Sequence, residues 1–306
     1  MELHTDYNSL TINNLCELFG KTKQAYYQRI KYNYQDVVKD DILIQMVKEE
    51  RKYMPKIGGR KLIYIINNQL PNDLQIGRDS FFKWLGNNNL LVRKTRTRII
   101  TTNSYHWLRK YPNLIKGYTP TAPNQLWVSD ITYIRTIEGV LFLFLITDAY
   151  SKKVVGWKVS KNLKAENAID ALNMAIKLNP NRDNNLIHHS DRGVQYCSGA
   201  YVKVLNKNNI KISMTQDGNP LDNAIAERIN GILKTEWLND LRIKNKRSAI
   251  TYLSQIIGIY NNRRPHLSLN MLTPNHVHQN IGLSRPPIRL WKNYYRDYYV
   301  KCSAGT

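Results

Sequence analysis

Cysteines, acidic residues and long apolar runs are all scarce in this chain of 306 residues. Its three cysteines, Cys16, Cys197 and Cys302, are scattered and odd in number, which suits a reducing compartment such as the cytoplasm. No C-x-x-C pair occurs, and no histidine–cysteine spacing matches a zinc site. We therefore expect a cytoplasmic protein without a structural zinc ion.

The apolar runs are too short for a membrane span. The longest, VLFLFLI at residues 140–146, falls far below the roughly 20 residues that a spanning helix needs. The first residues, MELHTD, contain neither the basic nor the apolar segment of a secretory signal. No basic amphipathic stripe lies beside an apolar helix long enough to anchor the chain. We therefore expect no membrane partner.

Basic residues greatly outnumber the acidic ones. The sequence has 45 lysines and arginines against 23 aspartates and glutamates, which gives a formal net charge of +22. Such an excess indicates a polyanionic partner, most simply a nucleic acid. The length of the chain allows two or three compact units.

Three of the acidic residues stand out by their surroundings. Asp130 lies in a β-like run, WVSDITYI (127–134), and Asp191 follows a short apolar run in HHSDRGVQY (188–196). Glu227 begins a helical pattern in GNPLDNAIAERINGILK (218–234). Carboxylates that converge from two strands and a helix could bind two divalent cations, which would activate a water or hydroxyl for phosphodiester chemistry. Oxygen-only ligands favour Mg²⁺ or Mn²⁺ over zinc.

These motifs resemble the catalytic core of DDE transposases, specifically insertion-sequence family three, which is related to retroviral integrase. The resemblance continues in PNQLWVSDITYI (123–134) and YNNRRPHLSL (260–269), and it spans roughly residues 119–278. It implies that Asp130, Asp191 and Glu227 are the catalytic metal ligands, for two Mg²⁺ or Mn²⁺ ions. The chain differs from retroviral integrases in lacking their N-terminal zinc unit.

The same resemblance implies a function and partners. The protein would be a transposase that binds the ends of its insertion sequence and catalyses metal-dependent DNA cleavage and strand transfer. Its partners would be double-stranded DNA and further copies of the chain on that DNA. It would act either alone or together with the product of an upstream reading frame. It would act in the bacterial cytoplasm, at the nucleoid, without an organic cofactor.

The order of elements indicates a mixed α/β domain at residues 119–280. Three β-rich runs, at 127–134, 140–146 and 153–160, precede alternating helices and strands. The expected elements that follow are a helix at 165–177, a strand at 186–189, a helix at 201–205, a strand at 210–214, and helices from about 224 and at 248–262. The resemblance supplies the name of the fold, a ribonuclease H-like core with a mixed five-stranded sheet and helices.

The residues before this core are predicted to be all-α. Residues 1–36 contain a first helix, a break at Gly20 and a second helix from Thr22, the expected N-cap, to Ile30. The segment LCELFGKTKQAYY (15–27) resembles a helix-turn-helix, whose second helix would enter the major groove. A helical hairpin that packs on the rest of the protein is the alternative. The candidate DNA contacts here are Lys21, Lys23, Gln24 and Arg29.

Residues 37–98 read as a second helix-turn-helix-like unit. Asp40 or Asp41 would cap a helix that ends near Pro55, a second helix would end before Pro71, and a third would run from about Asp79 to residue 86. The basic run RKTRTR (93–98) would contact phosphates, or would remain a solvated run of charge. The candidates in it are Arg93, Lys94, Arg96 and Arg98. Residues 99–118 form a linker, and residues 281–306 a basic aromatic tail that could contact DNA or dock on the core.

Further candidates lie inside the core. Lys234 is two helical turns after Glu227 and matches the family's basic residue that contacts terminal DNA, although a solvated lysine is the alternative. Arg263 and Arg264 are additional candidate DNA contacts. The segment QDGNPLDN (216–223) is predicted to be a mobile loop.

Some of the polar residues in the core have more than one interpretation. Asp148 is expected to lie beside Asp130, as a structural cap or as support for the metal ligands. His266 would approach the scissile phosphate or lock the C-terminal helix in place. Asp222 and Glu236 compete with Glu227, and the spacing of the family motif selects Glu227.

Two other functions fit parts of the sequence. The residues HSDR (189–192) match the H-x-x-R box of tyrosine recombinases, whose nucleophile is a tyrosine. A non-catalytic DNA-binding regulator would use only the N-terminal helices. Metal-dependent strand transfer distinguishes both from a transposase.

Overall fold

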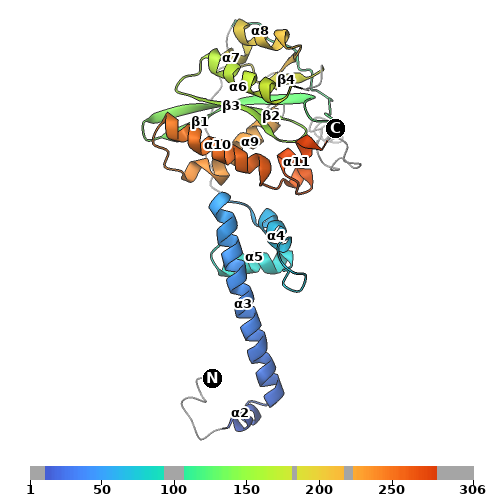
Figure 1. The fold of residues 1–306 in the computed structure, drawn as a ribbon, viewed down its shortest axis with the longest axis vertical. Coiled ribbons are helices and arrows are strands. Elements are labelled where there is room, and N and C mark those ends of the chain that lie inside the picture. Colours follow the sequence, from blue (N-terminus) through green and yellow to red (C-terminus); the bar gives the residue numbers. More distant parts are fainter. Residues whose placement is uncertain (1–10, 93–106, 181–184, 217–222, 281–306) are drawn as a thin grey trace, which may run out of the picture. The chain divides into compact units, whose positions relative to one another are not determined.

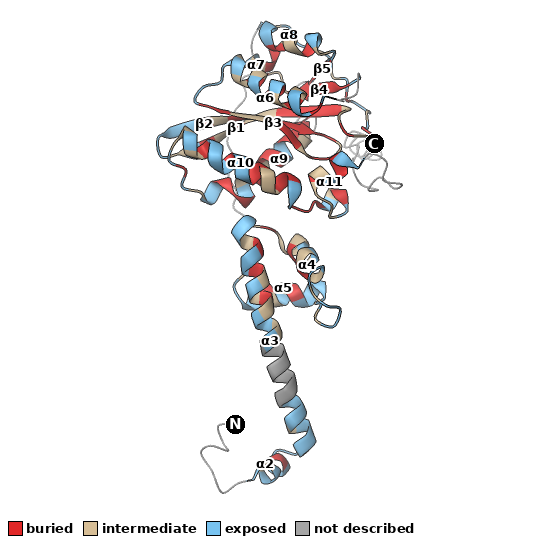
Figure 2. Ribbon diagram, viewed as in Figure 1, coloured by how far each residue is buried: buried red, intermediate tan, exposed pale blue. Residues whose placement is uncertain are grey.

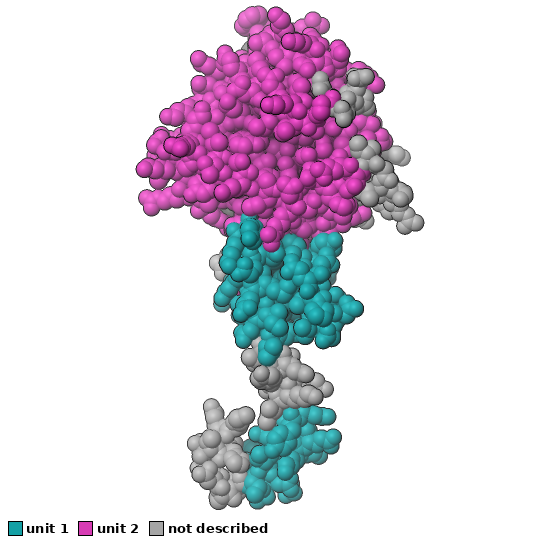
Figure 3. All heavy atoms as spheres, viewed as in Figure 1, with its two compact units in different colours: residues 1–53, 62–89 teal, residues 54–61, 90–306 magenta. Residues whose placement is uncertain are grey.

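The computed structural model describes residues 11–92, 107–180, 185–216 and 223–280. The chain divides into two compact units, which Figure 3 colours separately. One unit comprises residues 1–53 and 62–89, and the other comprises residues 54–61 and 90–306. Within the described residues, every strand belongs to the second unit.

The first described element is a short helix. α2 (Ile12–Leu18) begins after Thr11, whose hydroxyl caps it, and is followed by a turn in which Gly20 has a φ of +63°. Leu18 and Phe19, two apolar residues at helical spacing, are exposed rather than packed in a core. Gly20 therefore breaks the helix as predicted, because its left-handed backbone conformation costs glycine little.

A single long helix follows, where the sequence had suggested two. α3 (Lys23–Tyr53) begins after Thr22, whose hydroxyl accepts the Ala25 amide at 3.1 Å, so the predicted N-cap is confirmed. The expected boundary at residues 36 and 37 falls inside this helix. Asp40 is not a cap: its carboxylate accepts a hydrogen bond from Trp84 Nε1 at 2.8 Å. No glycine or proline lies between Lys23 and Tyr53, so nothing in the sequence ends the helix before Pro55.

Two further helices complete the first unit's core, close to the predicted positions. They are α4 (Gly59–Asn67) and α5 (Arg78–Asn87). Figure 2 colours the ribbon red where residues are buried. The core contains apolar side chains that are at most 1% exposed: Leu43, Val47, Leu62, Ile66, Phe81 and Leu85. The aromatic Phe81 therefore serves packing, as its helical spacing indicated.

The second unit is built on a mixed five-stranded sheet, as predicted, and the strand order is β3-β2-β1-β4-β5. Figure 1 labels β1, β2, β3 and β4 of this sheet. Its strands are β1 (Leu126–Thr136), β2 (Gly139–Asp148), β3 (Val154–Ser160), β4 (Ile187–Ser190) and β5 (Lys211–Met214). The first three pair antiparallel, whereas β4 is parallel to both β1 and β5. The central strand β1 is thus flanked by β2 along nearly its whole length and by β4 only at its start.

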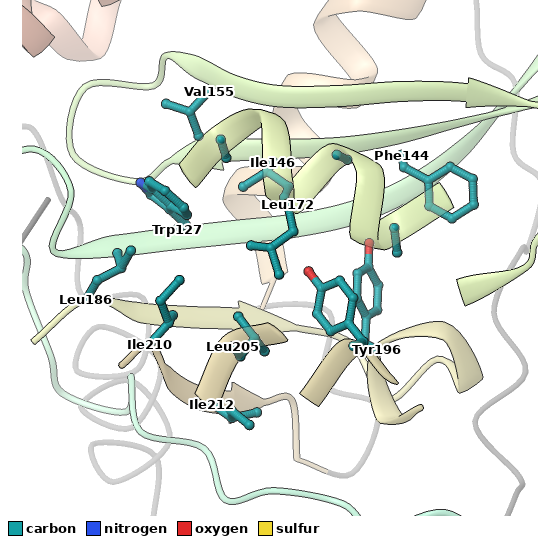
Figure 4. Packing of buried hydrophobic residues seen from close by; sticks show 14 of the residues in the cluster. Trp127, Phe144, Ile146, Val155, Leu172, Leu186, Tyr196, Leu205, Ile210 and Ile212 are labelled. Carbon is teal, nitrogen blue, oxygen red and sulfur yellow. The ribbon is translucent and has the colours of Figure 1, made fainter. Parts of the chain in front are cut away.

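One face of the sheet is covered by three helices: α6 (Ala165–Leu178), α7 (Val194–Cys197) and α8 (Gly199–Lys207). They close the main apolar cluster, in which Trp127 of β1 and Leu172 of α6 lie among side chains of β2, β3 and β5 (Figure 4). The approach of β3 and α6 is close: a Cβ on Gly156 would lie 2.2 Å from the carbonyl oxygen of Ala171.

The other face carries α9 (Ala224–Glu236) and α10 (Lys246–Asn262). Leu126 and Val128 pack there with Ala226, because neighbours of Trp127 along the strand point to the opposite side. The short helix η2 (Leu238–Asp240) lies between α9 and α10, and two further short helices, η3 (Leu267–Leu269) and α11 (Pro274–Gln279), follow α10. No helix among the described residues has the length and apolarity to cross a membrane.

Candidate active site

The register of the sheet brings two of the three predicted acids side by side. β1 and β4 pair in parallel from Leu126 with Ile187 to Val128 with His189. Continued by two residues, the same register sets Asp130 opposite Asp191, which directly follows the end of β4. Sites of α/β sheets commonly form where a parallel strand ends in this way.

The third acid comes from α9, which two asparagines tie to β1. Asn223 Nδ2 donates to the carbonyl oxygen of Ser129 at 2.9 Å, and Asn230 Nδ2 donates to Asp130 Oδ2 at 2.8 Å. Glu227 lies between them, four residues after the first and three before the second, so all three share one helix face. Sequence reasoning missed these asparagines, although the repeated spacing around Glu227 was visible in the motif.

The three carboxylates influence one another electrostatically. Burial, followed by the negative charge of Asp191, raises the pKa of Asp130 to about 7, and Glu227 raises it further. The hydrogen bonds from Asn230 and from the Ile131 amide oppose this rise. The pKa of Glu227 is raised as well, by desolvation and then by Asp191. The site therefore gathers carboxylates whose charged forms disfavour one another, and a bound cation would relieve that repulsion.

The donor set suits a hard divalent ion, but the side chains are turned towards protein partners. Among the described residues, no three His, Cys, Asp or Glu side chains form a group ready to hold a metal ion. The Asp130 carboxylate accepts from Asn230 and Ile131, and Asp191 Oδ1 accepts from the Gly193 amide at 3.0 Å. Small side-chain rotations would be needed to present an all-oxygen set, which matches Mg²⁺ or Mn²⁺.

A buried polar layer supports the strands beneath the acids. His188 Nε2 lies 2.6 Å from Ser129 Oγ and 2.9 Å from Tyr201 Oη. Burial, and then the neighbouring His189, lowers the pKa of His188 to about 3, so its imidazole is neutral. Ser129 and His188 precede Asp130 and Asp191 on the two paired strands, and their contact fixes the backbone that presents the acids.

The histidine of the H-x-x-R box is inside the protein. His189 is 0% exposed, and its Nδ1 lies 2.8 Å from Ser213 Oγ on β5. A recombinase histidine has to reach a scissile phosphate, and a side chain enclosed between two strands does not present itself to DNA. The motif is thus explained by packing of the sheet.

Asp148 does not lie beside Asp130, contrary to expectation. It pairs with Trp127 in the β1–β2 register, three positions away, and strand alternation directs it to the other face. Its fully buried carboxylate accepts from the Asn124 amide and from both the amide and the hydroxyl of Ser151, each at 2.7 Å. Asp148 is therefore a structural cap of the β2–β3 turn, the first of its two interpretations.

Arg264 is not available to DNA, which corrects its assignment as a DNA contact. Its guanidinium is 2% exposed and binds both carboxylate oxygens of Glu236, at 2.7 and 2.6 Å. This pairing also removes Glu236 as a rival of Glu227. His266 is buried, lies 2.9 Å from Arg264 Nη1 and packs edge-on against Tyr260, so it locks the C-terminal helices. The neighbouring Arg263 is exposed.

Lys234, the third predicted basic residue of the core beside Arg263 and Arg264, is near Asp130. Its ammonium is attracted by Asp130 and repelled by Arg135, and desolvation is the largest cause that lowers its pKa. Its Nζ lies over the ring of Tyr133, 3.7 Å from the centroid. A freely solvated lysine, the alternative interpretation, would have neither contact.

The predicted DNA contacts of the helical unit are exposed where the structure describes them. Lys21, Lys23, Gln24 and Arg29 are exposed at the turn between α2 and α3 and along the start of α3. Arg93, Lys94, Arg96 and Arg98 lie outside the described residues. So do Asp222, most of the predicted loop at 216–223, and the tail at 281–306.

The sequence is similar to known family profiles and proteins. Two family profiles, both described as an integrase core domain, match residues 120–220 and 208–274. A relative from Shigella sonnei, an uncharacterized 31 kDa protein of insertion element IS600, is 34% identical over 268 residues, which cover 85% of this chain and 96% of that protein.

Two further relatives show the same likeness. The transposase InsF for insertion sequence IS3A of Escherichia coli K12 is 36% identical over 187 residues, covering 60% of this chain and 65% of that protein. Among solved structures, the magnesium-bound catalytic core of HTLV-2 integrase is 22% identical and has a TM-score of 0.41, covering 52% of this chain and 99% of that one. This chain belongs to the IS3 family of transposases, and it contains an integrase core domain.

Proposed function

We propose that this protein binds the ends of its insertion sequence and catalyses metal-dependent DNA cleavage and strand transfer. The observation that carries the proposal is the mutual influence of Asp130, Asp191 and Glu227, three carboxylates from two paired strands and one helix. Burial, and then the negative charges of Asp191 and Glu227, raise the pKa of Asp130 to about 7. Acids that influence one another in a partly buried site in this way are typical of a metal-dependent site.

The proposed roles of the residues follow from this arrangement. Asp130, Asp191 and Glu227 would hold two Mg²⁺ or Mn²⁺ ions, which supply the chemistry of activating a water or 3′-hydroxyl and stabilising the leaving oxygen. Asp130 would give up its proton when it becomes a ligand, because ligating carboxylates are deprotonated. Lys234, close to Asp130, would contact a phosphate at the end of the DNA.

Recognition of the element ends is proposed for the helical unit. The exposed Lys21, Lys23, Gln24 and Arg29 surround the start of α3, a geometry in which a helix can enter the major groove. The net charge of +22 supports attraction to DNA of any sequence, which weakens as salt concentration rises. We further propose that several copies act together on the DNA, with or without an upstream-frame partner.

The test is an assay of the purified chain with labelled DNA that carries the element ends. We expect cleavage and joining products in Mg²⁺ or Mn²⁺, none in excess chelator, and no covalent adduct between protein and DNA. Undiminished activity in chelator, or a trapped phosphotyrosine, would contradict the proposal. Specific binding of the ends without any product in either metal would leave the regulator as the function.

A further inference from the structure

The contact between Lys234 and Tyr133 joins the catalytic helix to the catalytic strand. Tyr133 lies three residues after Asp130 on β1, and Lys234 lies seven residues after Glu227 on α9. The lysine Nζ is 3.7 Å from the centroid of the tyrosine ring, well within the range of a cation–π interaction. Both side chains are partly buried, which strengthens such a contact because water competes less for the ammonium.

The position of the ring follows from the shape of the sheet. β4 ends at Ser190, whereas β1 continues to Thr136 and pairs there with β2. Tyr133 is paired with Phe142 of β2, so its backbone is held within a regular ladder. The Tyr133 ring, fixed on β1 where this strand extends beyond β4, therefore restricts the position of the Lys234 ammonium.

A lysine at this point needs such a restraint. Its four-carbon stem has considerable rotamer freedom, and that freedom is lost whenever the ammonium is fixed on a phosphate. Asp130 attracts the ammonium and Arg135 repels it. Without the ring, the Asp130 carboxylate would draw the Lys234 ammonium towards itself. The ammonium would then compete with the proposed metal ion for that carboxylate.

We propose that Tyr133 is a positioning residue, whose ring face holds the Lys234 ammonium beside the carboxylates and ready for a phosphate of the DNA end. This inference rests on the proposed function, because it assigns Lys234 to the DNA. The ring contributes through the lysine and does not itself contact the substrate. Its effect therefore depends on the aromatic face and requires neither the tyrosine hydroxyl nor a negative charge.

A double-mutant cycle in the full chain tests the dependence on the lysine. The variants are Tyr133→Leu, Tyr133→Phe, Lys234→Met and the double variant Tyr133→Leu with Lys234→Met. We expect kcat/KM for end cleavage to fall about tenfold in Tyr133→Leu, as for a partly desolvated cation–π contact. Tyr133→Phe should stay within about twofold of wild type, since it keeps the ring face. In the Lys234→Met background, Tyr133→Leu should cost nothing more.

A spectroscopic measurement tests the contact without catalysis. Lysines methylated with a carbon-13 label keep their charge, and the methyl signals of Lys234, assigned with Lys234→Arg, should be shifted upfield by the ring. The shift should persist in Tyr133→Phe and vanish in Tyr133→Leu. Should Tyr133→Leu fold poorly, Tyr133→Met serves the same purpose. Tyr252→Leu, at an exposed tyrosine of α10, is the control expected to change neither readout.

Each outcome decides the matter. If Tyr133→Leu lowers kcat/KM by the same factor in the wild type and in the Lys234→Met background, the ring contacts DNA directly. If Tyr133→Phe lowers kcat/KM as much as Tyr133→Leu does, the effect belongs to the hydroxyl. Either result overturns the inference, and so does a Lys234 methyl signal that has the same chemical shift in wild type and in Tyr133→Leu. In all these cases metal-dependent cleavage by the wild type would still support the proposed function. A wild-type protein without metal-dependent cleavage would instead overturn the proposed function itself.

Discussion

Asn230 donates a hydrogen bond to Asp130 across 2.8 Å, which links the middle of α9 to the centre of the sheet. The same carboxylate also accepts from the Ile131 amide at 2.8 Å. Both bonds favour its charged form, against the burial and the charge of Asp191 that favour the neutral one. Asn230 thus helps to set both the direction and the protonation of the Asp130 carboxylate.

Replacement of Asn230 by alanine should weaken metal-dependent activity without abolishing it. Partners of metal ligands typically contribute about 10- to 100-fold to metal affinity or activity, so we expect a loss in that range. End cleavage measured against Mg²⁺ concentration should show a higher requirement for the ion. Asn262→Ala, at an exposed asparagine bonded to the Gly258 carbonyl, is the control. An unchanged Mg²⁺ requirement in Asn230→Ala would assign that residue to packing alone.

Conservative substitutions of the three acids should separate chemistry from binding. Asp130→Asn, Asp191→Asn and Glu227→Gln each remove a proposed metal ligand while retaining size, and the basic residues that contact phosphates remain. We expect each variant to lose end cleavage and strand transfer and to bind terminal DNA nearly as well as wild type. Gel assays of products and fluorescence anisotropy measure the two properties. A variant that retained wild-type turnover would take its residue out of the catalytic set.

The contribution of Asp130 to the stability of the metal-free protein should fall as pH rises from about 4 to about 7. The pKa of Asp130 is about 7 in the folded protein against 3.8 for the free side chain, so the folded state retains a proton that the unfolded state has released. This contribution is therefore greatest below the lower pKa, decreases through the interval and levels off above the higher one, whereas buried neutral His188, whose pKa is lowered, contributes with the opposite sign. Glu227, whose pKa is also raised, adds to the trend of Asp130.

Thermal unfolding in excess chelator at several pH values measures this effect. The difference between wild type and Asp130→Asn isolates the contribution of Asp130, because other groups titrate in both proteins. Mg²⁺ should stabilise the wild type more at pH 8 than at pH 5, since it binds the deprotonated carboxylates. Parallel profiles for the two proteins would show that Asp130 titrates normally.

The close approach of β3 and α6 predicts a sharp effect of one added methyl group. In Gly156→Ala the new Cβ would lie 2.2 Å from the Ala171 carbonyl oxygen and 2.9 Å from Ala175 Cβ, so strand and helix must separate. We expect a loss of unfolding free energy of about 1–3 kcal/mol or more in chemical denaturation. Gly258→Ala, in the middle of α10 with no atom within 4 Å of the new Cβ, should instead gain up to about 1 kcal/mol. Equal effects of the two substitutions would contradict the packing argument.

Local patterns sufficed for most of the architecture. The three β-rich runs became β1, β2 and β3 within a few residues, because strands buried on both faces keep apolar residues at nearly every position. Breaks at Gly20 and Pro55 were also visible, since these residues change what the backbone can adopt. The motifs predicted that the three acids lie together. The register of β1 and β4 explains this for Asp130 and Asp191.

The errors concern partners that are remote in sequence. Arg264 was grouped with the exposed Arg263, but its partner Glu236 lies 28 positions earlier and buries it. Asp40 had the composition of a helix cap, and only Trp84, which is 44 positions away, explains its place within α3. Asn223 and Asn230 were overlooked because an amide acquires its role from what it bonds, here the carbonyl of Ser129 and the carboxylate of Asp130.

Because α3 is one continuous helix, the number of residues between its two ends determines both their separation and their relative rotation about the helix axis. The helix has 31 residues, so it extends roughly 46 Å at 1.5 Å per residue. Lys23 and Arg29 lie near one end, and Leu43 and Val47 belong to the core at the other. Each residue inserted between them would turn one end by about 100° relative to the other, whereas seven would lengthen the rod by two turns and nearly restore its phase. Separation and rotation of the two ends are thus set together, so the core fixes the direction in which the proposed DNA contacts Lys23 and Arg29 face.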